Sequence, residues 1–405
     1  MLLDDDDEAM AMHIIFSHRK KERRIKWRHE RVNWATYVDR LHHTRSFEWK
    51  HRMPFDAFTE LVELLRPAIA VNEQRARAGG AGNDPIYPEM VCAIGVRFLA
   101  GEAERSLDDV FGISFGSTHR VINKFLLAVN ECESLAIRLP ESAEELKQSA
   151  DDWNSLSTAG GFFYGVIGAI DGWLCTHNRP AVDNGLDYFS GHYQTFGTNV
   201  QAICDSDLRF IYVAFAAPGK TNDVQAFRKL GALHDWQRRI NIAHDRKYFL
   251  LGDNAYILND SLLIPYSGAS RRQADKDAFN FYLSQLRIRI KMTFGLLCTK
   301  WRIFHRDTTY SMTKMRDIVN GATRLHNFVI DFKLQHNDNS FFSDEIDPLE
   351  GEPSSLDYRP TAIAADDAPA QESGRSDRRE WIRAELDACG LQRPLYNIDR
   401  NFASV

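Results

Sequence analysis

The sequence predicts an α/β domain built on a mixed sheet and preceded by an all-helical region. Between residues 51 and 150, apolar side chains recur at three- and four-residue spacing, which indicates helices. From residue 160 onward, short apolar runs alternate with helical patterns, which is typical of a sheet with helices packed on it. At about 100 to 200 residues per domain, a chain of 405 residues has room for both units.

Composition argues against a histone-like polycation, a membrane protein and a secreted, disulfide-rich protein. The chain is 44% hydrophobic and 11% aromatic, which is enough to bury a core, and its formal net charge of −6 argues against a histone-like polycation. No apolar run reaches the roughly 20 residues that a membrane span needs. The amino terminus is acidic where a signal peptide would be basic, so we expect no secretion. The six cysteines include no C-x-x-C pair, which favours reduced, individually buried thiols.

The charges are segregated along the chain. Residues 4–8 are all acidic, whereas residues 18–31 hold eight Lys or Arg against two Glu. Residues 338–380 hold twelve acids against four bases, and residues 271–302 hold eight Lys or Arg against two Asp. We therefore predict an acidic and then basic arm over residues 1–50 and an acidic, mostly disordered tail over residues 332–405, with a short helix near Trp381. The basic block is interpreted as a nuclear-import signal, a DNA-binding arm or a solvated helix.

The helical region, residues 51–150, contains a candidate helix-turn-helix. Helices are expected after Pro54 and from Pro88 to Ala100. Ser106 can cap a short helix, Gly112 allows a tight turn, and Ser114 can cap a second helix. A DNA groove would then meet the polar side chains of that second helix. These are Thr118, His119, Arg120, Asn123 and Lys124. The alternative is an ordinary helical hairpin with a glycine turn.

Strands and helices alternate after residue 160. An apolar run over residues 162–170 predicts a strand that ends at Asp171, and two further runs, 199–204 and 209–217, predict a hairpin. A helix is expected over residues 224–236, beginning near Asp223. Residues 247–251 predict another strand, which ends just before Asp253, and a long helix is expected over residues 275–300.

Carboxylates that follow adjacent strands converge at one edge of a sheet, where sites form in such folds. Because Asp171 and Asp253 would repel each other there, a cation is expected to offset them. Oxygen ligands with few imidazoles nearby favour Mg²⁺ or Mn²⁺, and a pair of such ions can activate a water and stabilise a leaving oxygen. The alternative interpretation is that each Asp only forms a turn.

Together these segments resemble the PIF/Harbinger family of DDE transposases and their domesticated relatives. The matching motifs span residues 160–331. They are Gly168-Ala-Ile-Asp171-Gly172, Asn199-Val-Gln-Ala-Ile-Cys-Asp205, Pro218-Gly-Lys-Thr-Asn-Asp223, Leu251-Gly-Asp253-Asn-Ala-Tyr256, Ile264-Pro-Tyr266, Asn280, Arg287, Phe294-Gly295-Leu296, Lys300-Trp-Arg302 and Leu325-His-Asn-Phe328. The resemblance implies an RNase H-like nuclease fold and metal-dependent cleavage and transfer of double-stranded DNA. It implies Asp171 and Asp253 as catalytic carboxylates and offers Asp223 as a further metal ligand.

One position departs from the family pattern. Relatives place a third catalytic Glu on the long helix, and Lys291 stands at that position here. No Asp or Glu occurs between Ala278 and Arg306, and Asp277 is too far along the helix to substitute, at about 21 Å for fourteen residues. The added ammonium opposes a divalent cation. We therefore expect an impaired or inactive nuclease whose DNA-binding surface persists.

The remaining expectations concern partners and neighbouring side chains. The resemblance implies a nuclear protein, and a Myb-like partner protein or a homo-oligomer is compatible with it. An inactive adaptor that binds DNA or proteins is the alternative function. Arg287 is expected either to contact a phosphate or to pair with a strand-end carboxylate. His326, Trp301 and Phe304 are interpreted as core residues, and His177 has a weaker claim to the site than the carboxylates.

Overall fold

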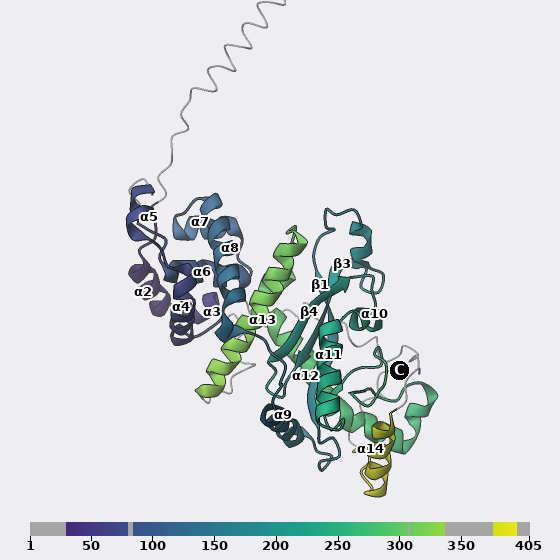
Figure 1. The fold of residues 1–405 in the computed structure, drawn as a ribbon. Coiled ribbons are helices and arrows are strands. Elements are labelled where there is room, and N and C mark those ends of the chain that lie inside the picture. Colours follow the sequence, from purple (N-terminus) through teal and green to yellow (C-terminus); the bar gives the residue numbers. More distant parts are fainter. Residues whose placement is uncertain (1–29, 80–83, 307, 337–375, 395–405) are drawn as a thin grey trace, which may run out of the picture.

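The computed structural model describes residues 30–79, 84–306, 308–336 and 376–394. The acidic run 4–8, most of the basic block 18–31 and residues 337–375 and 395–405 of the expected tail lie outside this part. Figure 1 shows the helical region beside the α/β domain, with helix α13 between them. Helix α13, Met312–Gln335, packs on both α8 and β4, so it joins the two parts.

The helical region is organised around α6, Pro88–Leu99. Every residue of this helix except Glu89 is buried. Pro88 occupies the first turn and Pro54 precedes α4, so both expected helix starts are confirmed. The other helices of this region are α2 Trp34–His43, α3 Phe47–His51, α4 Phe55–Ile69, α5 Glu73–Gly79, α7 Glu104–Phe111 and α8 Phe115–Glu131. Helix α9, Ala143–Leu156, packs instead on strand β1 of the sheet.

Helices α7 and α8 form the expected helix-turn-helix backbone. Gly112 ends α7 in the left-handed region, with a φ of 59°, which a side chain would disfavour. Ser114 precedes α8, as expected. Ser106 does not cap α7, because the helix already begins at Glu104 and Ala103 occupies the cap position.

The sheet is mixed and places β1 at its centre. Strand β1, Val166–Thr176, pairs antiparallel with β3, Thr195–Cys204, and parallel with β5, Phe249–Leu251. Strand β4, Phe210–Pro218, and the short β2, Phe189–Ser190, both pair with β3, while β6, Leu262–Leu263, pairs with β5. Three antiparallel strands followed by two parallel ones, with helices packed on them, are consistent with the RNase H-like fold.

Several expected boundaries are wrong. Strand β1 begins at Val166 rather than at residue 162, and β3 begins at Thr195 rather than at residue 199. Strand β1 does not end at Asp171, because its antiparallel pairing with β3 continues to Thr176. Asp171 lies instead just past the point where the parallel pairing of β1 with β5 stops, at Ala169 and Leu251. The single helix expected after Asp223 is divided into α10, Asp223–Arg228, and α11, Gly231–Ala243.

The long helix α12, Ala274–Lys300, crosses the sheet and contacts β1, β3 and β5. Helix α14, Asp377–Ala388, packs against the amino-terminal half of α12 and is the short helix that was expected inside the tail. Arg393 pairs with Asp277 at 3.0 Å, and the Tyr266 hydroxyl donates to Glu380 at 2.8 Å. The described part of the tail, residues 376–394, is therefore folded against the α/β domain.

Other expectations concern membranes and thiols. Among the described residues, no helix combines the length and the apolar composition that a membrane crossing requires. All six cysteines are free, and four of them are buried. Cys389 is exposed and Cys132 is half-buried, so the expectation of individually buried thiols is wrong for these two.

Candidate nuclease site

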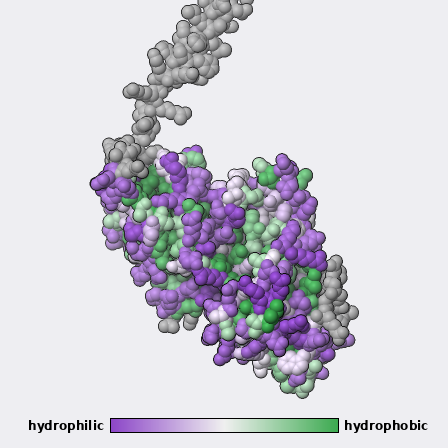
Figure 2. Space-filling view, viewed as in Figure 1, coloured by the Kyte–Doolittle hydropathy of each residue, from purple (hydrophilic) through white to green (hydrophobic). Residues whose placement is uncertain are grey.

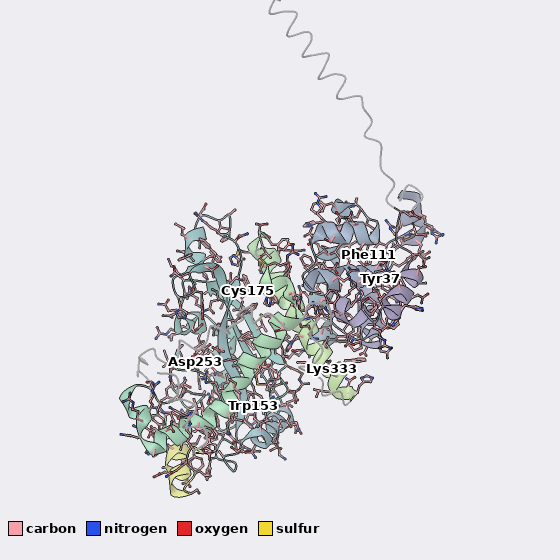
Figure 3. The ribbon with its side chains drawn as sticks, turned by 180° about the vertical axis from the view of Figure 1, so that it is seen from behind. Tyr37, Phe111, Trp153, Cys175, Asp253 and Lys333 are labelled. Atoms are coloured by element: carbon pink, nitrogen blue, oxygen red, sulfur yellow. The ribbon has the colours of Figure 1, made fainter. Side chains whose placement is uncertain are left out.

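Asp171 and Asp253 lie side by side on the sheet. Ala169 of β1 pairs in parallel with Leu251 of β5. Asp171 and Asp253 each follow this pair by two residues, so they lie at corresponding positions along the two neighbouring segments. Both carboxyl groups belong to buried residues, which are 4% and 3% exposed, and Figure 3 shows Asp253 well inside the α/β domain. The Gly172 and Ala255 backbone amides donate to Asp171 and Asp253 at 2.9 and 2.8 Å.

Asp223 reaches the same site from the start of α10. Its Oδ1 accepts hydrogen bonds from the side-chain amides of Asn199 and Gln201, both at 2.9 Å. The same oxygen would lie only 2.0 Å from a Cβ placed on Gly172, so the glycine after Asp171 is what lets Asp223 approach β1. The three residues Asp171, Asp223 and Asp253 are called the carboxylate site below.

Three buried polar side chains support the carboxylate site, and we call Asn199, Gln201 and Tyr256 the supporting network. Gln201 Nε2 also donates to Asn199 Oδ1 at 2.8 Å, and the Tyr256 hydroxyl donates to Gln201 Oε1 at 2.7 Å. Every donor and acceptor of the buried Gln201 amide group therefore has a partner, which fixes the orientation of the amide.

Burial and mutual repulsion perturb the acids. Burial raises the pKa of Asp171 well above its usual range, and the charges of Asp253 and Asp223 raise it further. Burial also raises the pKa of Asp253, with a second contribution from Asp223. The pKa of Asp223 is raised by burial, while the Asn199 and Gln201 amides and then His192 lower it. Burial thus disfavours the ionised form of all three acids, and a nearby positive charge would offset this effect.

Two cations on α12 supply part of that charge. Lys291 and Arg287 stand one turn apart and both lower the pKa values of Asp171 and Asp253. Lys291 has the larger effect of the two on Asp171, and Arg287 has the larger effect on Asp253. Of the two expectations for Arg287, its 7% exposure and its effect on Asp253 favour the interaction with a strand-end carboxylate.

The side chains present do not fit a complete metal centre. In the part of the chain that the structure describes, no three His, Cys, Asp or Glu side chains are arranged to hold one ion. Asp253 and Asp223 raise the pKa of Asp171, but such charge effects extend further than the roughly 2.0 to 2.6 Å of a Mg²⁺ or Ca²⁺ ligand bond. Lys291, the residue that the sequence predicts at the third-ligand position, is a cation that lowers the pKa values of Asp171 and Asp253. Among the described residues, the expected Mg²⁺ or Mn²⁺ centre therefore lacks three His, Cys, Asp or Glu ligands placed around one point.

The polar side chains of α8 divide into two groups. His119 and Arg120 are exposed, near Glu104 and Ser117. Thr118 is buried and its hydroxyl donates to Asp108, so it does not face a DNA groove as the helix-turn-helix interpretation required. Asn123 accepts a hydrogen bond from Lys314.

Lys124 is also engaged within the protein. Its ammonium donates to the Ile69 and Ala70 carbonyls at 2.9 and 3.3 Å, at the end of α4. Of the five side chains expected to contact DNA, His119 and Arg120 remain candidates. Both are exposed, although His119 lies 3.5 Å from the Glu104 carboxylate and Arg120 donates to the Ser117 hydroxyl. DNA contact by these two stays a prediction.

The remaining expected core residues are placed as follows. His326 is buried, with Nε2 at 2.8 Å from the Leu208 carbonyl, and Trp301 is fully buried. Phe304 packs edge-on against Trp173 with ring centroids 5.0 Å apart. His177 is buried beyond the end of β1, where its Nε2 lies 3.0 Å from the Thr198 hydroxyl, so it does not join the carboxylate site.

The supporting network has no role in the sequence-based predictions, although its residues lie within the matching motifs. One signal was available: Asn199 and Gln201 are polar residues two positions apart in an otherwise apolar run, so they share one face of a buried strand. Such residues need hydrogen-bond partners, and these partners lie on a loop and a helix that sequence spacing does not place.

Comparisons with known proteins agree with this geometry. Residues 170–327, which contain the whole carboxylate site, match the family described as DDE superfamily endonuclease. The chain is 24% identical over 314 residues to Protein ALP1-like from Arabidopsis thaliana, an alignment that covers 75% of each protein. No solved structure matches the chain significantly. The mixed sheet and its strand-edge carboxylates lie within the matched residues, so this part of the chain is similar to the DDE superfamily endonucleases.

Proposed function

We propose that this chain is a transposase-derived DNA-binding protein whose nuclease is impaired. One observation carries the proposal: Lys291 lies on α12 within electrostatic reach of Asp171 and Asp253, where a third carboxylate would complete the site. Double-stranded DNA is the proposed ligand.

Charge arithmetic supports the impairment. Three Asp with Arg287 and Lys291 sum to a formal charge of −3 + 2 = −1 when all are ionised, whereas a Glu at position 291 would give −4 + 1 = −3. At about 4 Å and an effective dielectric near 20, each pair of unit charges contributes about 4 kcal/mol. A change of two charge units therefore weakens the attraction for a divalent cation steeply.

DNA binding is proposed to persist because it uses a different surface. His119 and Arg120 are exposed on α8, far along the chain from Lys291, and Arg105 adds an exposed guanidinium 4.0 Å from the Phe115 ring. Binding through such cations releases counterions, so the affinity for DNA falls as salt increases. Affinity that does not change with salt would favour a protein-binding adaptor instead.

The experiment is a strand-cleavage assay on duplex DNA with Mg²⁺ or Mn²⁺. We expect no cleavage by the unmodified protein and measurable cleavage by Lys291→Glu. Full cleavage by the unmodified protein would contradict the impairment.

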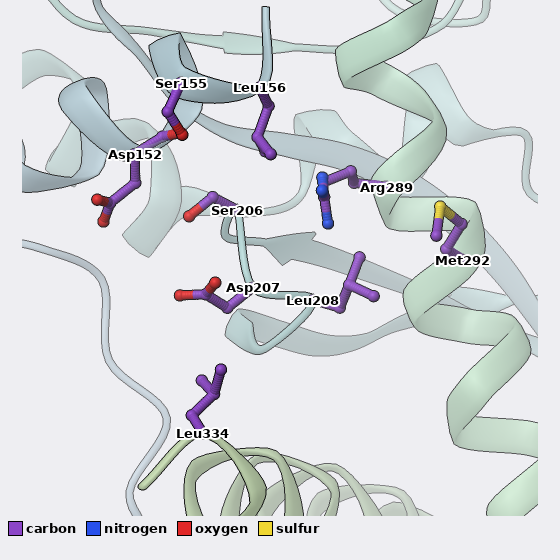
Figure 4. A pocket seen from close by; sticks show the side chains of 9 residues that line it. All are labelled: Asp152, Ser155, Leu156, Ser206, Asp207, Leu208, Arg289, Met292 and Leu334. Atoms are coloured by element: carbon purple, nitrogen blue, oxygen red, sulfur yellow. The ribbon is translucent and has the colours of Figure 1, made fainter. Parts of the chain in front are cut away.

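Arg289→Glu is the matched control, because it makes the same charge change two residues away on the same helix. Figure 4 shows Arg289 pointing into a cavity of about 370 Å³ beside Asp207 and Leu208, and neither Asp171 nor Asp253 lines this cavity. Arg289→Glu should therefore stay inactive. Cleavage by both variants would indicate a general effect of negative charge on α12.

We also propose a nuclear location, on the basis of the basic block 18–31, and leave room for a Myb-like partner protein or a homo-oligomer. Deleting residues 18–31 from a tagged protein should shift it out of the nucleus. Unchanged accumulation in the nucleus would reassign the block to DNA contact or to a solvated helix.

A further inference from the structure

The segment that precedes α2 packs on the turn of the helix-turn-helix. Val32 donates its backbone N–H to the Phe111 carbonyl at 3.4 Å, and the Val32 side chain packs against the hydrophobic core. Asn33 then caps α2, because its side chain accepts from the Thr36 backbone N–H at 3.0 Å. Residues 30–33, here called the anchor segment, are therefore fixed between the α7–α8 turn and the start of α2.

Gly112 allows the anchor segment to cross this turn. A Cβ placed on Gly112 would lie 1.8 Å from the Glu30 carbonyl oxygen and 3.0 Å from the Arg31 Cα. Both of these neighbours are backbone atoms, so no side-chain rotation could make room. Gly112 therefore serves two purposes, since it ends α7 in the left-handed region and admits the backbone of the anchor segment.

Most of the basic block comes immediately before the anchor segment. Residues 18–29, here called the basic arm, hold seven Lys or Arg against one Glu. They lie outside the described residues, but the last of them, His29, is one peptide bond from Glu30. Because Glu30 lies against Gly112, the basic arm starts at the turn of the helix-turn-helix.

Exposed cations of the helix-turn-helix lie close to the same turn. Arg120 follows Phe115, the first residue of α8, by five residues, which is about 7.5 Å along the helix. Arg105 is exposed on α7 with its guanidinium 4.0 Å from the Phe115 ring centroid, whereas Asp109 is an exposed acid of the same helix. Figure 2 shows hydrophilic residues with smaller hydrophobic patches at the top of the helical region, where Figure 1 places α7 and α8. The basic arm thus starts beside a surface that already holds exposed cations.

A duplex that meets α8 would also be within reach of the basic arm. The major groove, about 12 Å wide, admits a helix, while the adjacent minor groove is only about 6 Å wide. The twelve residues of the basic arm span at most about 40 Å, which exceeds the roughly 34 Å of one helical turn of DNA. Arg and Lys neutralise phosphates, and the narrow minor groove of A·T-rich DNA attracts them further. The composition and the starting point of the basic arm therefore suit the minor groove beside α8.

We propose that the basic arm, anchored at Gly112, is a second DNA contact that lies in the minor groove next to the major groove entered by α8. This inference rests on the proposed DNA-binding function and names both a further part of the chain that binds the duplex and the kind of DNA that it favours, which is A·T-rich. Nuclear import through the same cations, proposed above, precedes DNA binding and is compatible with it.

The test measures binding of the full-length protein to two duplexes of equal length, one A·T-rich and one G·C-rich, at several salt concentrations. The unmodified protein should bind the A·T-rich duplex about fivefold or more tightly than the G·C-rich one. The arm variant replaces the seven cations: Arg19→Ala, Lys20→Ala, Lys21→Ala, Arg23→Ala, Arg24→Ala, Lys26→Ala and Arg28→Ala. This variant should lose the preference, and the slope of log affinity against log salt should fall by about 0.9 for each phosphate that the basic arm contacts.

A flexible Gly-Ser linker of about ten residues, inserted between His29 and Glu30, tests the anchoring, because it keeps every charge. Binding should weaken several-fold, since the effective concentration of the basic arm at the DNA falls as the linker lengthens. Deleting residues 2–8 is the matched control, because it removes the acidic end of the same terminus and should not weaken binding. Urea unfolding of every variant should match that of the unmodified protein, because all the changes lie before the anchor segment.

Three results would each overturn the inference while the proposed function stands. They are an unchanged salt dependence in the arm variant, an unchanged affinity after the linker insertion, and a lower salt slope without any preference for A·T-rich DNA. Weaker binding after deletion of residues 2–8 would also overturn it, because the terminus would then act irrespective of its charge. Failure of the unmodified protein to bind either duplex overturns both the inference and the proposed function.

Discussion

The side-chain amide of Gln201 donates to the Asp223 carboxylate at 2.9 Å and accepts from the Tyr256 hydroxyl at 2.7 Å. This pairing links strand β3, the start of α10 and the turn after β5. The supporting network therefore holds Asp223 in place through hydrogen bonds from strand β3, backed by one from the turn after β5.

Tyr256→Phe removes one hydroxyl from the supporting network and leaves Gln201 Oε1 buried without its donor. The free energy of unfolding should fall by about 1 to 3 kcal/mol, measured by urea denaturation. Tyr282→Phe is the control, because its hydroxyl donates over 3.3 Å to the Gln392 carbonyl at a half-buried site, and a smaller loss is expected. If both variants lose the same free energy of unfolding, the buried supporting network is no more sensitive to the loss of a hydroxyl than a half-buried site.

Gly172→Ala places a methyl group 2.0 Å from Asp223 Oδ1 and 2.6 Å from Gln201 Nε2. Asp223 must move, and stability should fall by about 1 to 3 kcal/mol as in other overpacked sites. Gly295→Ala is the matched control on α12, since nothing lies within 4 Å of its new methyl group. This control should be neutral or stabilising by up to about 1 kcal/mol. Thermal melting that ranks the two variants the other way round contradicts the packing described here.

His51 makes the helical region sensitive to acid. Its ring is fully buried and stacked on Phe47 at 4.2 Å, with Nδ1 donating to the Phe47 carbonyl. Burial lowers the pKa of His51 to about 3. Because the unfolded chain takes up this proton near pH 6.5 and the folded chain does not, stability is present above pH 6.5 and is lost as the pH falls toward 3.

Between pH 6.5 and 5 the His51 contribution amounts to about 2 kcal/mol. His51→Phe should flatten the pH dependence of unfolding by that amount, although His326, with a pKa lowered to about 4, keeps part of the slope. Urea unfolding at pH 5 and 7 measures this, with the exposed His119→Gln as control. An identical pH dependence in His51→Phe and the unmodified protein would exclude this explanation.

Arg120 and Lys124 should respond differently to substitution although both are cations on α8. Arg120→Ala should weaken DNA binding and reduce the slope of log affinity against log salt by about 1. Lys124→Ala should leave that slope unchanged and instead lower stability by about 1 kcal/mol, since the Ile69 and Ala70 carbonyls lose their donor. If Lys124→Ala reduces the salt dependence, its ammonium exchanges the α4 carbonyls for DNA.

Much of the fold could be predicted because local signals were strong. Pro88 and Gly112 mark helix ends through their own backbone restrictions, and the apolar runs of β3, β4 and β5 were read correctly as strands. The errors arose where pairing across the fold decides the outcome. Asp171 lies within β1 because β3 continues alongside it, and no local pattern shows that.

The same distinction applies to the candidate site. Asp171, Asp223 and Asp253 could be chosen from motif positions, and the structure brings them to one place. The burial of Thr118 and the engagement of Lys124 depend on Asp108 and on the end of α4, which lie 10 and about 55 residues away along the chain. The sequence therefore identified the polar side chains of the helix, but it could not show which of them face the solvent.

Lys291 is proposed to prevent divalent metal binding at the carboxylate site. Calorimetric titration of Mn²⁺ into the full-length protein, Lys291→Glu and the control Arg289→Glu tests it without requiring catalysis. We predict that Lys291→Glu binds Mn²⁺ at least about tenfold more tightly than the other two, because 1.4 kcal/mol already gives that factor. Equal Mn²⁺ affinity in all three proteins would show that Lys291 does not control metal binding.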